Sequence, residues 1–104
     1  MSKTILVIGP FHPKNDELSY LIGKIKEQGG EGLAMDVSIL GDPEQPVDIS
    51  KHDVAAATGE TINDLIGLGE EGIAFARMSA AAAATTLKLY QDGKIDGMIS
   101  LGGT

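Results

Sequence analysis

The sequence contains no cysteine and no tryptophan among its 104 residues. The lack of cysteine excludes disulfides, thiol catalysis and cysteine-ligated zinc, and it is compatible with a cytoplasmic protein. Two Phe and two Tyr are too few for the aromatic platforms on which single-stranded nucleic acids stack. Positive charge is also scarce. Eight Lys and Arg stand against fifteen Asp and Glu, and this net charge of −7 argues against a nucleic acid as the partner.

Long apolar runs are absent as well. The run Ile5-Leu6-Val7-Ile8 ends at Gly9, which makes it too short for the apolar part of a signal peptide. The alanine-rich stretch 78–87 is too short and too weakly apolar for a bilayer, which requires about 20 apolar residues. We therefore expect a cytoplasmic protein that contacts no membrane.

Three segments predict the strands of a parallel sheet. Residues 3–9 contain a run, Thr4–Ile8, that is apolar on both faces, which is typical of a central strand covered by helices on both sides. Residues 32–37 and 96–101 predict the other two strands. Strands that alternate with helices favour right-handed crossovers, and a central first strand gives the order 2-1-3. We expect a three-layer α/β fold over residues 1–104, a single Rossmann-like or flavodoxin-like subdomain with a small parallel sheet.

Four helices are expected between these strands. The first begins at Asn15 or the next residue and ends at Gly29. Its apolar stripe consists of Leu18, Leu21, Ile22 and Ile25. Two short helices follow capping patterns at Ser50 and Thr61, and a long helix covers 70–91. The face of the long helix expected to approach the sheet consists of Ile73, Ala76, Ala80, Ala83, Leu87 and Tyr90. The loop before Ser50 is expected to be solvated, and its acidic residues are Asp42, Glu44 and Asp48.

A sheet of three strands would have two open edges and an uncovered apolar face. The sequence also ends at Gly102-Gly103-Thr104, a turn that normally leads into a helix. We therefore expect the N-terminal fragment of a longer protein, whose remaining part covers the apolar face. If this fragment folds alone, we expect a homo-oligomer.

The loops after strands one and three form the candidate ligand site. In such sheets, ligands bind past the carboxyl ends of the strands, where the strand order reverses. Gly9–Lys14 offers a lysine and a helix N-terminus there, and Gly102–Thr104 offers backbone N–H groups and a hydroxyl, a combination that suits a phosphate. Simpler alternatives stay open: Lys14 as a solvated cation, and the glycine pair as an ordinary turn. Asp36, at the end of strand two, binds a ribose or caps a turn.

No catalytic or metal-binding set can be recognised. His12 and His52 lie on separate loops without metal-ligand spacing, and no Ser-His-Asp arrangement can be placed. The sequence also has neither of the common glycine-containing phosphate-loop patterns. We expect no protein-bound metal site and no catalysis by this chain alone.

Several short motifs, in their order and spacing, suggest a family. They are Ile5–Gly9, Lys14-x-x-Glu17-Leu18, Met35-Asp36-Val37-x-x-Leu40-Gly41, Asp48-Ile49-Ser50, Val54-Ala55-Ala56, Gly93–Gly97 and Leu101-Gly102-Gly103. With these motifs, nearly the whole chain resembles the N-terminal part of the family typified by the tomato mosaic virus resistance protein, an ATP-binding group. Members of that family are much longer than this chain.

The resemblance implies that the chain binds ATP, with magnesium, and that it has a protein partner. The implied nucleotide-binding residues are Gly9, Phe11, Lys14, Glu17, Asp36, Gly102, Gly103 and Thr104. The family usually has Gly-Thr-x-Asp-Thr-Lys after the first strand, whereas this chain has Pro10, His12 and Pro13 in place of the two threonines and the aspartate. Two further functions remain open. The chain could be part of an enzyme that acts on a phosphorylated or carboxylated metabolite, or a structural and assembly piece without a ligand.

Overall fold

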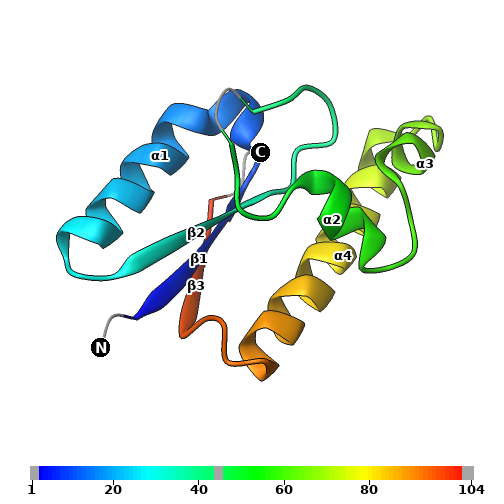
Figure 1. The fold of residues 1–104 in the computed structure, drawn as a ribbon. Coiled ribbons are helices and arrows are strands. Elements are labelled where there is room, and N and C mark those ends of the chain that lie inside the picture. The colour runs from blue at the N-terminus through cyan, green and yellow to red at the C-terminus, as the bar shows by residue number, and fades with distance from the viewer. Residues whose placement is uncertain (1–2, 44–45, 102–104) are drawn as a thin grey trace.

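The computed structural model describes residues 3–43 and 46–101, drawn as a ribbon in Figure 1. The strands are β1 (Thr4–Gly9), β2 (Glu31–Asp36) and β3 (Gly97–Ser100), and the helices are α1 (Phe11–Glu27), α2 (Lys51–Ala56), α3 (Ile62–Ile66) and α4 (Glu71–Gln91). The sheet is parallel throughout, in the order β2-β1-β3. The predicted α/β fold, the strand order and the central position of the first strand are therefore confirmed.

The apolar character of β1 follows from its place between two layers of helices. Figure 1 shows α1 on one side of the sheet and α2 with α4 on the other. On the α1 side, Val7 packs with Leu18 in one cluster of buried residues. On the α4 side, Leu6 and Ile8 pack with Met78 in a second cluster. Alternate residues of β1 thus enter different halves of the core, so its buried residues Leu6, Val7 and Ile8 are all apolar.

The helix ends follow the local signals of the sequence. Gly29, just after α1, has φ = +88°, a conformation that glycine adopts without strain. Thr61 and Asp64 form a reciprocal capping box at α3, and the Ser50 hydroxyl accepts a hydrogen bond from the backbone N–H of Asp53 at α2. Hydrogen bonding to Thr61 holds the pKa of Asp64 below its ordinary value of 3.8. The backbone N–H of Thr61 has the larger effect and its side chain the smaller one.

The start of α1 differs from the prediction. The helix begins at Phe11 and not at Asn15, and its first turn is irregular, with non-helical backbone angles at His12 and Lys14. Two contacts explain this start. The Phe11 side chain is buried in the α1 half of the core, and its N–H donates to Asp36 across the sheet edge. Tertiary packing thus adds a turn that helical periodicity alone does not predict.

The predicted sheet-facing side of α4 is wrong. Ala74, Met78 and Ala81 are buried instead, in contact with the cluster that also contains residues of α2 and α3. The expected face is open, with Ile73 and Tyr90 45% and 64% exposed. Apolar residues lie around much of this helix, so that helical spacing fits two different stripes and does not decide between them.

The expectation of two open sheet edges is also wrong, because a loop covers one of them. Asp48 accepts a hydrogen bond from the Ala34 N–H at 2.7 Å, and Ile49 pairs with β2 through its N–H to Ala34 and its C=O to Asp36. Asp48 is therefore not simply a solvated acid of the loop, as predicted, but a partner of the outer β2 edge. Only β3 has a free edge among the described residues.

Candidate functional site

The loop after β1 lies directly beside the segment after β3. The backbone N–H of Leu101 donates to the Ile8 carbonyl at 2.9 Å. A Cβ on Gly9 would lie 2.7 Å from Cδ2 of Leu18 and 3.1 Å from the carbonyl oxygen of Leu101. Glycine therefore allows β1, α1 and the end of β3 to meet at one point, as the crevice prediction required. Gly102, Gly103 and Thr104 lie outside the described residues.

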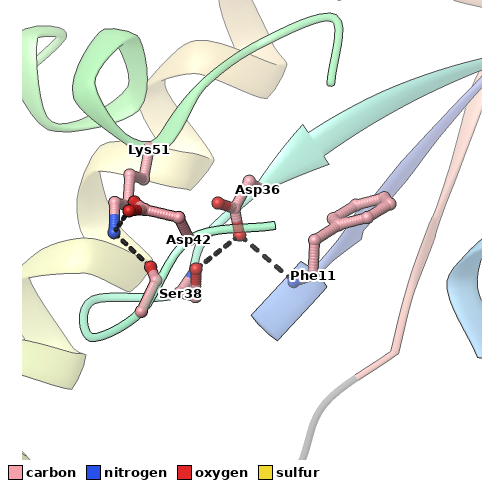
Figure 2. A network of polar contacts seen from close by, with 6 residues as sticks. Phe11, Asp36, Ser38, Asp42 and Lys51 are labelled. Carbon is pink, nitrogen blue, oxygen red and sulfur yellow. Dashed lines mark hydrogen bonds and ion pairs between the residues drawn. The ribbon is translucent and has the colours of Figure 1, made fainter. Parts of the chain in front are cut away.

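Asp36 joins the loops after β1 and β2. Its side chain is 1% exposed, and Oδ1 accepts hydrogen bonds from the Phe11 N–H at 3.1 Å, the Ser38 N–H at 3.0 Å and the Ser38 hydroxyl at 2.7 Å. Figure 2 shows the carboxylate between the two partners. Of the two alternatives left open by the sequence, this arrangement fits the turn cap, because the carboxylate organises the protein's own backbone.

Lys51 is a buried cation that the sequence analysis missed. Its side chain is 7% exposed, and Nζ donates to the Gly41 carbonyl and lies 3.2 Å from the Asp42 carboxylate. Figure 2 shows this contact beside the Asp36 contacts, on the same loop after β2. A lysine at the first position of a short helix has no sequence pattern that distinguishes it from a surface residue. Its partners come from a loop whose path only the folded chain defines.

The first half of α1 carries the other predicted site residues. Lys14 is half-buried at the irregular turn, and Glu17 is exposed one turn later. Asn15, between them, is 6% exposed, and its Oδ1 has no hydrogen-bond donor among residues 3–43 and 46–101. From its position in the sequence, Asn15 is predicted only as a helix cap. Its burial instead makes it a polar group that needs a donor at this end of the sheet.

An open apolar groove of about 1090 Å³ extends from this crevice along β3 and α4. Pro10, His12, Ser38, Ser100 and Leu101 line its end at the crevice. Farther along, apolar side chains of α4 and Met98 line it. Lys14 and Glu17 do not line this groove, so the structure separates them from its apolar wall.

The described residues contain no group of three or more His, Asp or Glu side chains that could hold a metal ion. Within the same part of the chain, no helix has the length and apolarity to cross a membrane.

Known relatives share this sequence over nearly its whole length. A UPF0261 protein of Brucella suis biovar 1 (strain 1330) is 46% identical over 103 residues, which cover 99% of this chain and 25% of the relative. A UPF0261 protein of Clostridium tetani (strain Massachusetts / E88) is 33% identical over 104 residues, which cover 100% of this chain and 26% of the relative. The chain thus spans about a quarter of the curated relatives that it matches. No solved structure matches it.

These relatives correct the family inferred from the sequence motifs. The resemblance to the family of the tomato mosaic virus resistance protein is wrong, because the matching family model and the names of the relatives all refer to UPF0261. ATP binding, which that resemblance implied, stays a prediction. The chain belongs to the uncharacterised protein family UPF0261, and it matches the N-terminal domain of that family over residues 3–104.

Proposed function

We propose that this domain binds a nucleotide, with ATP and magnesium as the first candidate, at the crevice past the carboxyl ends of β1 and β3. The observation that carries the proposal is the contact of Gly9 with Leu18 and Leu101, which brings the loops after β1 and β3 to one point. The direction in which strands are added to the sheet reverses at this point, because β2 lies on one side of β1 and β3 lies on its other side.

The phosphates would depend on a small set of groups. Pro10 has no N–H, the Phe11 N–H already donates to Asp36, and the Lys14 N–H donates to the Pro10 carbonyl. The first turn of α1 therefore offers few free backbone donors to an anion. In this proposal, the Lys14 ammonium meets the phosphate charge, and Gly102, Gly103 and Thr104 supply backbone and hydroxyl donors. Asp36 positions the loop through Phe11 and does not contact the ribose.

Calorimetric titration with magnesium–ATP tests the proposal. The titration uses the 104-residue chain and a chimera in which this chain replaces the matched quarter of the Brucella suis relative. Lys14→Ala should weaken binding by about 1 to 3 kcal/mol, the usual range for the loss of a charged hydrogen bond. Lys26→Ala removes the same charge from the exposed last turn of α1 and should leave affinity unchanged. Equal affinity of wild type and Lys14→Ala would remove Lys14 from the site.

A second candidate function is a docking domain without a ligand. Two observations favour it. The buried side chains of Asp36 and Lys51 are both already bonded to other groups of this chain, and the groove beside the crevice is apolar. If neither the chain nor the folded chimera binds a nucleotide, this second function replaces the first. Turnover of a phosphorylated or carboxylated metabolite by the chimera would instead support the enzyme alternative.

A further inference from the structure

The groove between β3 and α4 is lined by large apolar side chains that are open to solvent, and a contiguous apolar surface of this kind often marks an interaction site. Its α4 wall includes Phe75, Leu87 and Tyr90, which are 63%, 56% and 64% exposed, and its floor includes Met98, which is 49% exposed. The register fixes the direction of Met98. It pairs with Leu6, whose side chain enters the core on the α4 side, so Met98 lies on that face as well.

One edge of the sheet is covered by a loop, and the other is open in the described part of the chain. The outer edge of β2 is covered by Asp48 and Ile49, which bond to Ala34 and Asp36. The outer edge of β3 has no strand beside it in the described part of the chain. Proteins normally cover or charge such an edge, because an exposed one pairs with other chains. Met98 and Ile99 of β3 are apolar instead, which is the composition of an interior strand.

The right-handedness of strand–helix–strand crossovers predicts which element would cover the groove. The crossover from β1 to β2 uses α1 on one face, and the crossover from β2 to β3 runs in the opposite direction through α4 on the other face (Figure 1). A further strand beside β3 would continue in the direction from β2 to β3. A right-handed connection would then place its helix on the α4 face, directly over the groove. Ser79, Ala82 and Ala83 of α4 line this side, and small side chains allow a second helix to approach closely.

We propose that the groove is the docking site of a helix from the polypeptide that full-length members of this family have outside the matched quarter, and that this helix leads to a fourth parallel strand on the free edge of β3. About three quarters of the Brucella suis relative lies outside the match, enough for this addition and further domains. The docked helix presents an apolar stripe to Met98, Leu87 and Tyr90. The inference does not depend on nucleotide binding.

The two tyrosines of the chain provide a matched test. Tyr90 lies in the groove and is 64% exposed, whereas Tyr20 lies on α1, away from the groove, and is 68% exposed. Nitration with tetranitromethane, measured by mass spectrometry of peptides, is carried out on the chimera with the Brucella suis relative. Tyr90 should be nitrated several-fold more slowly than Tyr20. Equal rates, or protection of Tyr20 instead, would overturn the proposal. Tyr90 protection that disappears on dilution would assign the groove to a second copy and would also overturn it.

Hydrogen exchange on the natural full-length Brucella suis relative gives a result that needs no chimera. The amides aligned with β3 should exchange as slowly as those aligned with β1, because both strands would then lie inside the sheet. Fast exchange at alternate β3 amides is the signature of a free edge and would contradict the fourth strand.

Discussion

Substitution of Asp36 by alanine should destabilise the domain more than any surface carboxylate does. The side chain is 1% exposed and accepts three hydrogen bonds through Oδ1, two of them from the backbone N–H groups of Phe11 and Ser38. Both of these residues are themselves buried, so water cannot easily replace the lost acceptor. The Ser38 hydroxyl can rotate toward another partner, but the two N–H groups cannot.

The expected magnitude follows from these two groups. A buried donor without an acceptor costs about 1 to 3 kcal/mol, so Asp36→Ala should lower the free energy of unfolding by about 2 to 6 kcal/mol. Domains of this size have about 5 to 15 kcal/mol in total, so the variant would be close to unfolding. Asp36→Asn keeps an uncharged acceptor in place and should cost about 1 kcal/mol. The chain has no Trp, and urea unfolding is therefore followed by far-UV circular dichroism.

Asp96→Ala is the matched control. Asp96 also accepts a backbone N–H, from Thr4 at 2.8 Å, but the site is exposed and water replaces the lost carboxylate. Its cost should stay within about 1 kcal/mol. If Asp36→Ala costs no more than Asp96→Ala, the carboxylate does not hold the two loops together, and the reasoning is refuted.

Other predictions concern packing, pH and association. Gly9→Ala should destabilise the fold by about 1 to 3 kcal/mol through its contact with Leu18. Gly23→Ala, in open space inside α1, should stabilise the fold by about 0.5 to 1 kcal/mol, and urea unfolding that ranks the two alike would contradict the packing argument. Thr61→Val removes the hydroxyl and keeps the backbone N–H, so the pKa of Asp64 should rise partway to its ordinary value in an NMR titration. An unchanged pKa would show that the hydroxyl does not lower it. Because the folded-state pKa is lowered, Asp64 stabilises the fold above pH 3.8, and this contribution is lost as the pH falls through the folded-state pKa. The isolated chain should associate through its open groove, and light scattering that finds a monomer at high concentration would argue against this.

Periodicity and capping residues predicted most of the fold. Residues 4–8 are apolar on both faces, and this alone placed β1 in the centre and gave the strand order. The patterns at Ser50 and Thr61 were equally informative, because a cap is a local interaction between residues three positions apart. The predictions failed where long-range contacts decide. The stripe of α4 was misplaced because a helix that is apolar over much of its surface offers two choices.

The candidate site was less predictable from the sequence than the fold. The meeting of the loops after β1 and β3 followed from topology, and Gly9 marks it. By contrast, the role of Asp36 depends on Phe11, 25 positions away, and that of Lys51 depends on the path of the loop at Gly41. Hydrogen bonds between distant segments have no periodicity in the sequence. Asn15 illustrates the same limit, since its position suited a cap but the folded chain buries it.

The position of β3 at the end of a long connection has a consequence for the time course of folding. β1, α1 and β2 are consecutive and can assemble through local contacts, whereas the contact of Thr4 with Asp96 closes a loop of 92 positions. Closing such a loop costs entropy before the contacts between β1 and β3 can form and stabilise it. We therefore expect β3 to join the sheet late. During synthesis, the edge of β1 that pairs with β3 would stay open until β3 has been made. This interval is when the nascent chain is most exposed to aggregation, and chaperones would act on it there.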